Sequence, residues 1–291
     1  MISHTLISYL LDVTGASAVD SVETMQELWS GYGEIFRVHF SDSESIVVKH
    51  IVWPEAINHP RGWATDFSHQ RKVTSYDVEF NFYKQHSHIN HLCRTPQLLA
   101  SQRSEHELIL VLEDLNALGF TRRPSSLTHK EIKFCLTWLA NFHAQYMRGV
   151  GEDEKAVDGL WETGTYWHLE TRPDELEALK DATLKQAASQ FDCALKEGIP
   201  QTLVHGDAKL ANFCFSHDGA NVAAVDFQYV GGGCGMKDLA YFMSSCLNER
   251  ECEESEAWVL DHYFHELRRA LTHNKHPIDL DSLEESWRRV Y

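Results

Sequence analysis

Residues 203–215 read LVHGDAKLANFCF, an apolar run interrupted by closely spaced polar side chains. Within eight positions the chain carries His205, Asp207, Lys209 and Asn212. Two short apolar runs then flank an Asp-Gly pair at 218–219, which is a strong local signal for a β-hairpin. Because a hairpin brings its two ends together, this pattern predicts that Asn212 and Asp226 lie close to each other.

The side chains at the ends of this hairpin suit phosphoryl transfer. An amide oxygen from Asn212 and a carboxylate from Asp226 are oxygen ligands of the kind that Mg²⁺ binds together with substrate phosphates. A second carboxylate, Asp207, can accept a proton from a hydroxyl nucleophile, and Lys209 can offset charge on a moving phosphoryl group.

The spacing matches the catalytic loop of protein kinases, H-R-D-x-x-x-x-N. Residues 205–212, HGDAKLAN, differ from this pattern only in having Gly206 in place of the arginine. The kinase D-F-G is represented by Asp226-Phe227-Gln228. Upstream, Lys49 ends the strand-like IVVK, and Glu79 lies in the helical pattern that follows it. These elements occur in the order that the kinase mechanism requires, and this order is more specific than any single motif.

VHGDAKLANFCF, AVDFQYV and GMKDLAYFM resemble the aminoglycoside phosphotransferase and choline kinase superfamily. The D-F-Q form and KVTSYDVEFNFY are most similar to the ecdysteroid kinase-like branch. The resemblance extends from about residue 31 to 291. It implies an α+β, protein kinase-like fold with a small mixed N-lobe at 1–115 and a mainly helical C-lobe at 116–291. It also implies ATP between the lobes and transfer of its γ-phosphoryl group to a hydroxyl.

The resemblance implies a role for each matching residue. Asp207 would be the catalytic base or orienter, assisted by Lys209, and Asn212 with Asp226 would hold Mg²⁺. The expected nucleotide-binding positions are Lys49 for the α- and β-phosphates, Glu79 to fix that lysine, Glu113 to Leu115 as the adenine hinge, and the weaker glycine-loop candidates Gly31 and Gly33. Asp238 is similar to a family position that supports the catalytic loop, and His205 is expected to be structural.

Some features depart from the protein-kinase pattern. YVGGGCGMKD follows D-F-Q directly, which leaves no A-P-E segment and too short a loop to dock a peptide. Protein is therefore not the expected substrate. SGYGEIF has Phe36 where the last glycine of a phosphate-binding loop would lie, so close cradling of phosphates by this loop is not expected. Residues 54–71 have no counterpart in the simple template and are expected to be irregular and to shape the cleft.

Hydrophobic periodicity predicts the remaining elements. We expect helices over 4–12, 72–87, 128–147 (with Thr128 and Glu131 as a capping box) and 173–196, and more helix after 236. Strands are expected over 27–40, 43–51, 96–101 and 107–115, with Gly31 and Gly33 inside the first. The glycine-rich 231–235 is expected to be a flexible connection. Histidines near 86–93 match no common metal-site spacing and are expected to be exposed or to cap a helix.

Composition limits the function. The 291 residues include 43 acidic and 26 basic side chains, giving a net charge of −17, so nucleic acid and anionic membranes are not expected partners. No apolar run approaches the roughly 18 residues of a membrane span, and the N-terminus lacks the features of a secretory signal. Seven scattered cysteines suggest reduced thiols. A cytoplasmic protein follows from these observations.

Two questions stay open from the sequence. The acceptor could be an amino alcohol, an aminoglycoside or a sterol-like polyol, and the oligomeric state is not indicated. The chain could also be a catalytically silent kinase-fold protein that binds a ligand or partner. The complete set of Asp207, Asn212 and Asp226 favours an enzyme.

Overall fold

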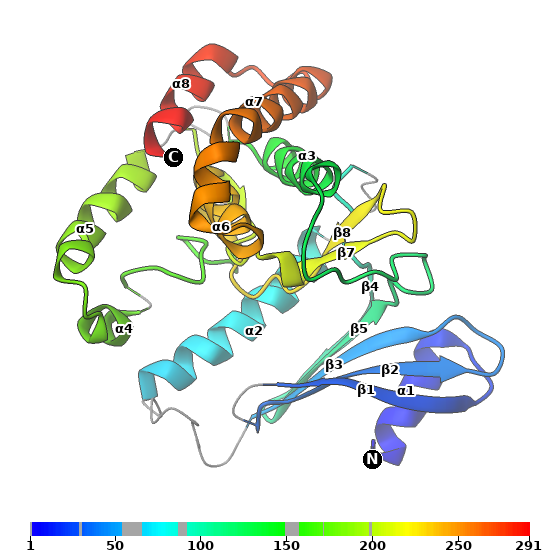
Figure 1. Ribbon diagram of the computed structural model, residues 1–291. Coiled ribbons are helices and arrows are strands. Elements are labelled where there is room, and N and C mark those ends of the chain that lie inside the picture. Colours follow the sequence, from blue (N-terminus) through cyan, green and yellow to red (C-terminus); the bar gives the residue numbers. More distant parts are fainter. Residues whose placement is uncertain are drawn as a thin grey trace.

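The computed structural model describes residues 2–28, 31–53, 66–86, 92–148, 157–170, 172–197 and 200–291. A five-stranded antiparallel sheet with helix α1 forms one part, and a mainly helical part faces it (Figure 1). Helix α2 lies between the two parts (Figure 1). The predicted α+β class, with a small mixed part and a larger helical part, is confirmed. The elements of the first part are α1 (His4–Thr14), β1 (Val19–Glu27), β2 (Gly33–Phe40), β3 (Ile46–Val52), α2 (Asp66–His86), β4 (Leu98–Arg103) and β5 (Glu107–Glu113).

The sheet has the strand order β1-β2-β3-β5-β4, so β3 and β5 are central and are buried on both faces. Alternate residues of a strand face opposite sides. Ile109 and Val111 of β5 pack with Leu6 and Leu10 of α1, whereas Leu110 belongs to the main core. Helix α1 therefore covers one face of the sheet, and the other face is left for α2 and the helical part. Each leucine that becomes fully buried stabilises the folded state by about 1.5–3 kcal/mol.

The strand predicted over 27–40 is wrong at its beginning. Residues 19–27 form the separate edge strand β1, which pairs antiparallel with β2 from Gly33 to Phe40. The sequence of β1, VDSVETMQE, gave no strand signal because its side chains are almost all exposed and do not alternate between apolar and polar. Gly31 therefore lies in the turn between two strands, and Gly33 begins β2.

The larger part begins after β5 and shares the main core with α2 and the sheet; within it, α3 packs along α7. Thr128 and Glu131 form the predicted capping box of α3, and Asn248 with Glu251 caps α7 in the same way. Its elements are α3 (His129–Gln145), α4 (Pro173–Ala178), α5 (Ala182–Glu197), β6 (Thr202–Val204), η3 (Leu210–Asn212, a 3₁₀ turn), β7 (Phe213–Phe215), β8 (Val222–Ala224), β9 (Gly231–Gly233), α6 (Met236–Cys246), α7 (Glu249–His273) and α8 (Leu280–Val290).

Three further expectations about elements are corrected. The helix expected over 173–196 is broken at residues 179–181 into α4 and α5. Helix α2 begins at Asp66, so the end of the segment 54–71 is helical rather than irregular. The rest of that segment, 54–65, and most of the histidine cluster, 87–91, lie outside the described residues.

The glycine-rich 231–235 is not a flexible connection. Gly231–Gly233 forms strand β9, which is buried and pairs antiparallel with β6 immediately before the catalytic-loop motif. Backbone crowding explains the glycines: a Cβ on Gly231 would overlap the carbonyl of Trp161, and one on Gly164 would lie 2.6 Å from the Gly231 nitrogen. The close approach of the neighbouring backbone therefore requires glycine in this strand, and no side-chain pattern marks it in the sequence.

Among the described residues, each helix is too short or too polar to cross a bilayer.

Candidate active site

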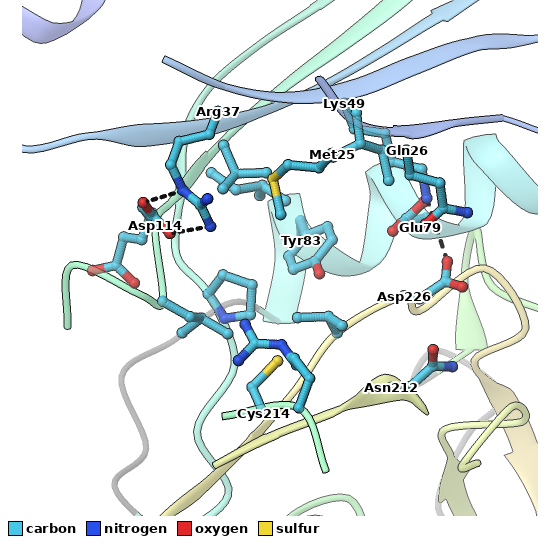
Figure 2. A pocket seen from close by; sticks show the side chains of 18 of the residues that line it. Met25, Gln26, Arg37, Lys49, Glu79, Tyr83, Asp114, Asn212, Cys214 and Asp226 are labelled. Atoms are coloured by element: carbon cyan, nitrogen blue, oxygen red, sulfur yellow. Dashed lines mark hydrogen bonds and ion pairs between the residues drawn. The ribbon is translucent and has the colours of Figure 1, made fainter. Parts of the chain in front are cut away.

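A cavity of about 270 Å³ lies between the sheet and the helical part. Its roof is formed by β1, β2 and β3, its back by α2, and its floor by η3 and the β7–β8 hairpin (Figure 2). Six residues that the sequence singled out line it: Lys49, Glu79, Glu113, Leu115, Asn212 and Asp226. Residues from these distant segments therefore meet at one volume, but the expected catalytic residues Asp207 and Lys209 are not among those that line it.

Lys49 and Glu79 form a buried ion pair at the back of the cavity. Lys49 Nζ lies 2.6 Å from Glu79 Oε2, and the two residues are 4% and 2% exposed. Lys49 Nζ also donates to Asp226 Oδ1 at 3.3 Å. Burial alone would lower the pKa of Lys49, but the carboxylates of Glu79 and Asp226 outweigh it and raise that pKa. The lysine is thus a fixed cation that faces the cavity.

Asp238 anchors the backbone of the catalytic-loop motif. Its Oδ2 accepts a hydrogen bond from the His205 amide at 2.6 Å, and its Oδ1 accepts one from the Gly206 amide at 2.9 Å. Asp238 also contacts His143 Nε2 at 3.1 Å. Burial would raise the pKa of Asp238, but these hydrogen bonds lower it, which keeps the carboxylate ionised. Gly206 is required because its φ is +79° and a Cβ there would overlap the carbonyl of Tyr229.

The same loop fixes one oxygen of Asp207 and leaves the other unbonded. Lys209 Nζ and Asn212 Nδ2 donate to Oδ2 at 2.7 and 3.1 Å. Oδ1 is buried and has no hydrogen-bond partner in the part of the chain that is described. Tyr241 lies beside this carboxylate, and burial together with Asp207 raises the pKa of its phenol. An unbonded buried carboxylate oxygen costs free energy unless a further group binds there.

The hairpin places Asn212 and Asp226 at its open end. Phe213 pairs with Ala224, and the Val225 amide donates to the Asn212 carbonyl at 3.0 Å. Because the side-chain nitrogen of Asn212 is used by Asp207, the amide oxygen is left for the cavity, and it points toward Asp226 (Figure 2). Burial would raise the pKa of Asp226, but Lys49 and Lys72 outweigh it and lower that pKa to about 2.

The side chains of Glu113 and Asp114 hold the segment Glu113 to Leu115 in place through different partners. Glu113 accepts hydrogen bonds from Arg94 and from the Gln97 amide at 2.6 and 2.7 Å. Asp114 accepts bonds from Arg37 Nε at 2.7 Å and from Ser45. Arg37 also pairs with Glu23 on β1 at 2.9 Å, so the hinge segment is tied to the roof of the cavity (Figure 2).

Gly31 and Gly33 are not among the described residues that line the cavity. Met25 and Gln26 of β1 occupy the corresponding part of the roof. Gly33 has φ +116°, and a Cβ there would overlap the carbonyl of His50. Glycine at this position therefore allows β2 to pair closely with β3.

Several residues at the site were not predicted from the sequence. They are Arg37, Lys72, Ser75 and Tyr241, and the side-chain contacts of Asp114 and Gln228 were not predicted either. One signal was present, because Lys72 precedes Glu79 by seven residues and therefore lies on the same face of α2 two turns earlier. The partners across the fold are far apart in sequence and have no motif of their own.

The chain belongs to the ecdysteroid kinase-like family, whose model matches residues 71–163 and 154–276. This match covers most of the chain and confirms the resemblance to the ecdysteroid kinase-like branch. No curated protein matches the chain.

Several solved structures are similar to the chain at low identity. Aminoglycoside phosphotransferase APH(3'')-Id from Streptomyces rimosus, solved with ADP and streptomycin, is 15% identical with a TM-score of 0.46, covering 100% of this chain and 98% of its own. An aminoglycoside-3'-phosphotransferase of type VIII is 14% identical with a TM-score of 0.46, covering 99% and 100%. A protein assigned as a fructosamine-3-kinase from Haemophilus somnus is 13% identical with a TM-score of 0.47, covering 98% and 96%.

Proposed function

We propose that the protein is an ATP- and Mg²⁺-dependent kinase that transfers the γ-phosphoryl group of ATP to a hydroxyl of a small molecule. Residues 1–115 would bind the nucleotide, and residues 116–291 would supply the catalytic loop and the acceptor side. One observation carries the proposal: the Lys49–Glu79 pair, Asn212 and Asp226 line one cavity, and Asn212 donates a hydrogen bond to Asp207, whose Oδ1 is unbonded.

The residues present fit a magnesium ion. The amide oxygen of Asn212 and the Oδ2 atom of Asp226 are hard oxygen donors, and the donor pair leaves room for phosphate oxygens and water. When bound, the ion would neutralise charge on the β- and γ-phosphates. The cavity wall at Glu113 to Leu115 would contact the adenine through its backbone. Met25 and Gln26, instead of Gly31 and Gly33, would cover the phosphates.

The remaining chemistry follows from how Asp207 is held. Lys209 and Asn212 fix its Oδ2, so Oδ1 is the atom that can accept the hydrogen of an acceptor hydroxyl. The acceptor oxygen then forms a bond to the γ-phosphorus. The bond between the γ-phosphorus and the oxygen that bridges the β- and γ-phosphates breaks, and ADP leaves. Lys49 stays charged throughout because two carboxylates hold it, and it stabilises the α- and β-phosphates.

The test is ADP release by purified protein over a panel of hydroxyl compounds that includes amino alcohols, aminoglycosides and sterol-like polyols. Asp207→Asn should lower turnover by about 10²–10⁴-fold on the acceptor that wild type uses, because proton transfer is lost. It should keep the Mg²⁺-dependent thermal stabilisation by ATP.

Asp12→Asn is the matched control, because Asp12 is exposed on α1 far from the cavity, and it should leave both quantities unchanged. Unchanged turnover in Asp207→Asn would remove this residue from the mechanism. Nucleotide binding by wild type without turnover on any acceptor would favour a silent kinase-fold protein.

A further inference from the structure

One face of helix α2 contacts both β3 and the turn that carries Asp226. Glu79 meets Lys49 at the back of the cavity. Two turns earlier, Lys72 Nζ donates to Gln228 Oε1 at 3.0 Å, and the Ser75 hydroxyl lies 3.2 Å from the same oxygen. Ser75 is also 2.8 Å from the Lys72 carbonyl, so its single hydrogen is shared and Lys72 is the main donor to Gln228.

The orientation of the Gln228 amide follows from these donors. An ammonium group can only donate, so the amide oxygen must face Lys72 and the amide nitrogen must face the other way. That nitrogen donates to Asp226 Oδ1 at 2.6 Å. Burial and the neighbouring Lys49 lower the pKa of Lys72 to about 8, which leaves it mostly protonated near pH 7.

Asp226 needs this support for two reasons. Its φ is +69°, a left-handed conformation that costs a non-glycine residue about 1–3 kcal/mol unless the surroundings impose it. Its Oδ1 receives both Lys49 and Gln228, at 3.3 and 2.6 Å, which turns the other oxygen, Oδ2, toward the cavity. A carboxylate held by two donors on one oxygen has one rotamer and presents one free oxygen.

We propose that Lys72 and Gln228 are positioning residues, which tie the Asp226 turn to α2 and aim Asp226 Oδ2 at the metal position. The metal position itself rests on the proposed function. Gln228 acts through Asp226, and Lys72 acts through Gln228. The residue after Asp226-Phe227 is therefore a polar anchor at the position where protein kinases have the glycine of D-F-G.

The first test needs no ligand. Hydrogen–deuterium exchange is followed in peptides that span residues 224–230. Lys72→Met should raise exchange in this segment at least about 10-fold, because the turn opens more often once the amide of Gln228 is released. Lys72→Arg should restore most of the protection. Lys84→Met, an exposed lysine on the same helix, should leave the segment unchanged. Equal protection in Lys72→Met and wild type would overturn the tether.

The second test measures apparent Mg²⁺ affinity from the thermal stabilisation given by a non-hydrolysable ATP analogue. Gln228→Glu keeps an acceptor for Lys72 but loses the donor to Asp226 and adds a negative charge beside it. The tether predicts at least about 10-fold weaker Mg²⁺ binding in this variant and in Lys72→Met. Unchanged or tighter binding in Gln228→Glu would mean that residue 228 is itself a metal ligand, which overturns the proposal.

The two proposals can fail separately. Wild type that shows no metal-dependent stabilisation and no turnover would end the proposed function, whereas the exchange experiment would still decide whether Lys72 holds the turn. Wild type with normal turnover, combined with unchanged exchange in Lys72→Met, would end only the tether.

Discussion

The Lys49–Glu79 pair offers a sharp energetic test, because both partners are almost fully buried. Removing one partner of a buried ion pair costs about 3–5 kcal/mol, since it leaves an uncompensated charge. For Lys49→Met we expect about 3–5 kcal/mol at pH 7–8. For Glu79→Leu we expect the lower end, about 3 kcal/mol, because Asp226 still lies 3.3 Å from the ammonium.

The double variant should cost no more than the weaker single variant, because replacing a buried pair with apolar side chains is often close to neutral. The coupling energy from the double-mutant cycle should therefore be at least about 2 kcal/mol. The assay is urea unfolding of the nucleotide-free protein, followed by both tryptophan fluorescence and circular dichroism. A matched cycle on the exposed helix pair Arg250 and Glu254 should give a coupling of about 0.5 kcal/mol or less.

The pH dependence of the Lys49→Met variant gives a second readout of the same burial. Burial raises the pKa of Glu79, and the variant lacks the cation that opposes this shift. At pH values between the pKa of Glu79 in the unfolded chain and its higher pKa in the folded protein, the folded state binds one more proton than the unfolded state. The free energy of unfolding therefore falls as the pH rises through the folded-state pKa. The cost of Lys49→Met should therefore be larger at pH 8 than at pH 5. Additive single variants, or a cost independent of pH, would refute the buried coupled pair.

Three further predictions test the loop, the metal ligand and the thiols. Gly206→Ala should be far more destabilising than Gly15→Ala in thermal unfolding, because both have positive φ but only the first would overlap a neighbouring carbonyl; equal costs would contradict the crowding. Asn212→Leu should abolish Mg²⁺-dependent stabilisation by ATP but retain the fold by circular dichroism, and retained metal dependence would exclude Asn212 as a ligand. Native protein should react rapidly with a thiol reagent at Cys193, the exposed cysteine, and more slowly at the half-buried Cys246 and Cys252; an equally fast phase in Cys193→Ser would contradict the lower exposure of the other thiols.

The sequence predicted the parts of the site whose geometry is local. Asp207, Lys209 and Asn212 lie on one loop, and the hairpin turn at 218–219 then brings Asp226 to them, so spacing alone sufficed. Lys49 and Glu79 were identified by their order in the kinase template, and the structure places them in contact on β3 and α2. In each case a short segment with its own structural preference fixed the position of the side chain.

The contacts that escaped prediction are long-range and use common residue types. Arg37 and Asp114 are 77 positions apart, and Lys72 and Gln228 are 156 apart. Their pairing depends on how the sheet and α2 pack on the helical part, which no local pattern encodes. Strand β9 escaped for a different reason, because glycines carry no side-chain periodicity and their burial is decided by the backbone of residues 161–164.

The two expected metal ligands are held by different parts of the fold. The loop that carries Asn212 is anchored to α6 through Asp238, which binds the amides of His205 and Gly206. The turn that carries Asp226 is tied to α2 through Gln228, whose amide nitrogen donates to Asp226 Oδ1 and whose amide oxygen accepts a hydrogen bond from Lys72; Lys49 ties the same oxygen to β3. The strands β7 and β8 connect the two, and the hydrogen bond from the Val225 amide to the Asn212 carbonyl closes the hairpin at the ligand end. The separation of the two ligand oxygens is therefore set by a three-residue ladder, while their orientation is set by helices on opposite sides of the cavity. Under the proposed tether, a movement of α2 would rotate the Asp226 carboxylate more than it would move Asn212, and would therefore change whether the two oxygens face one ion position.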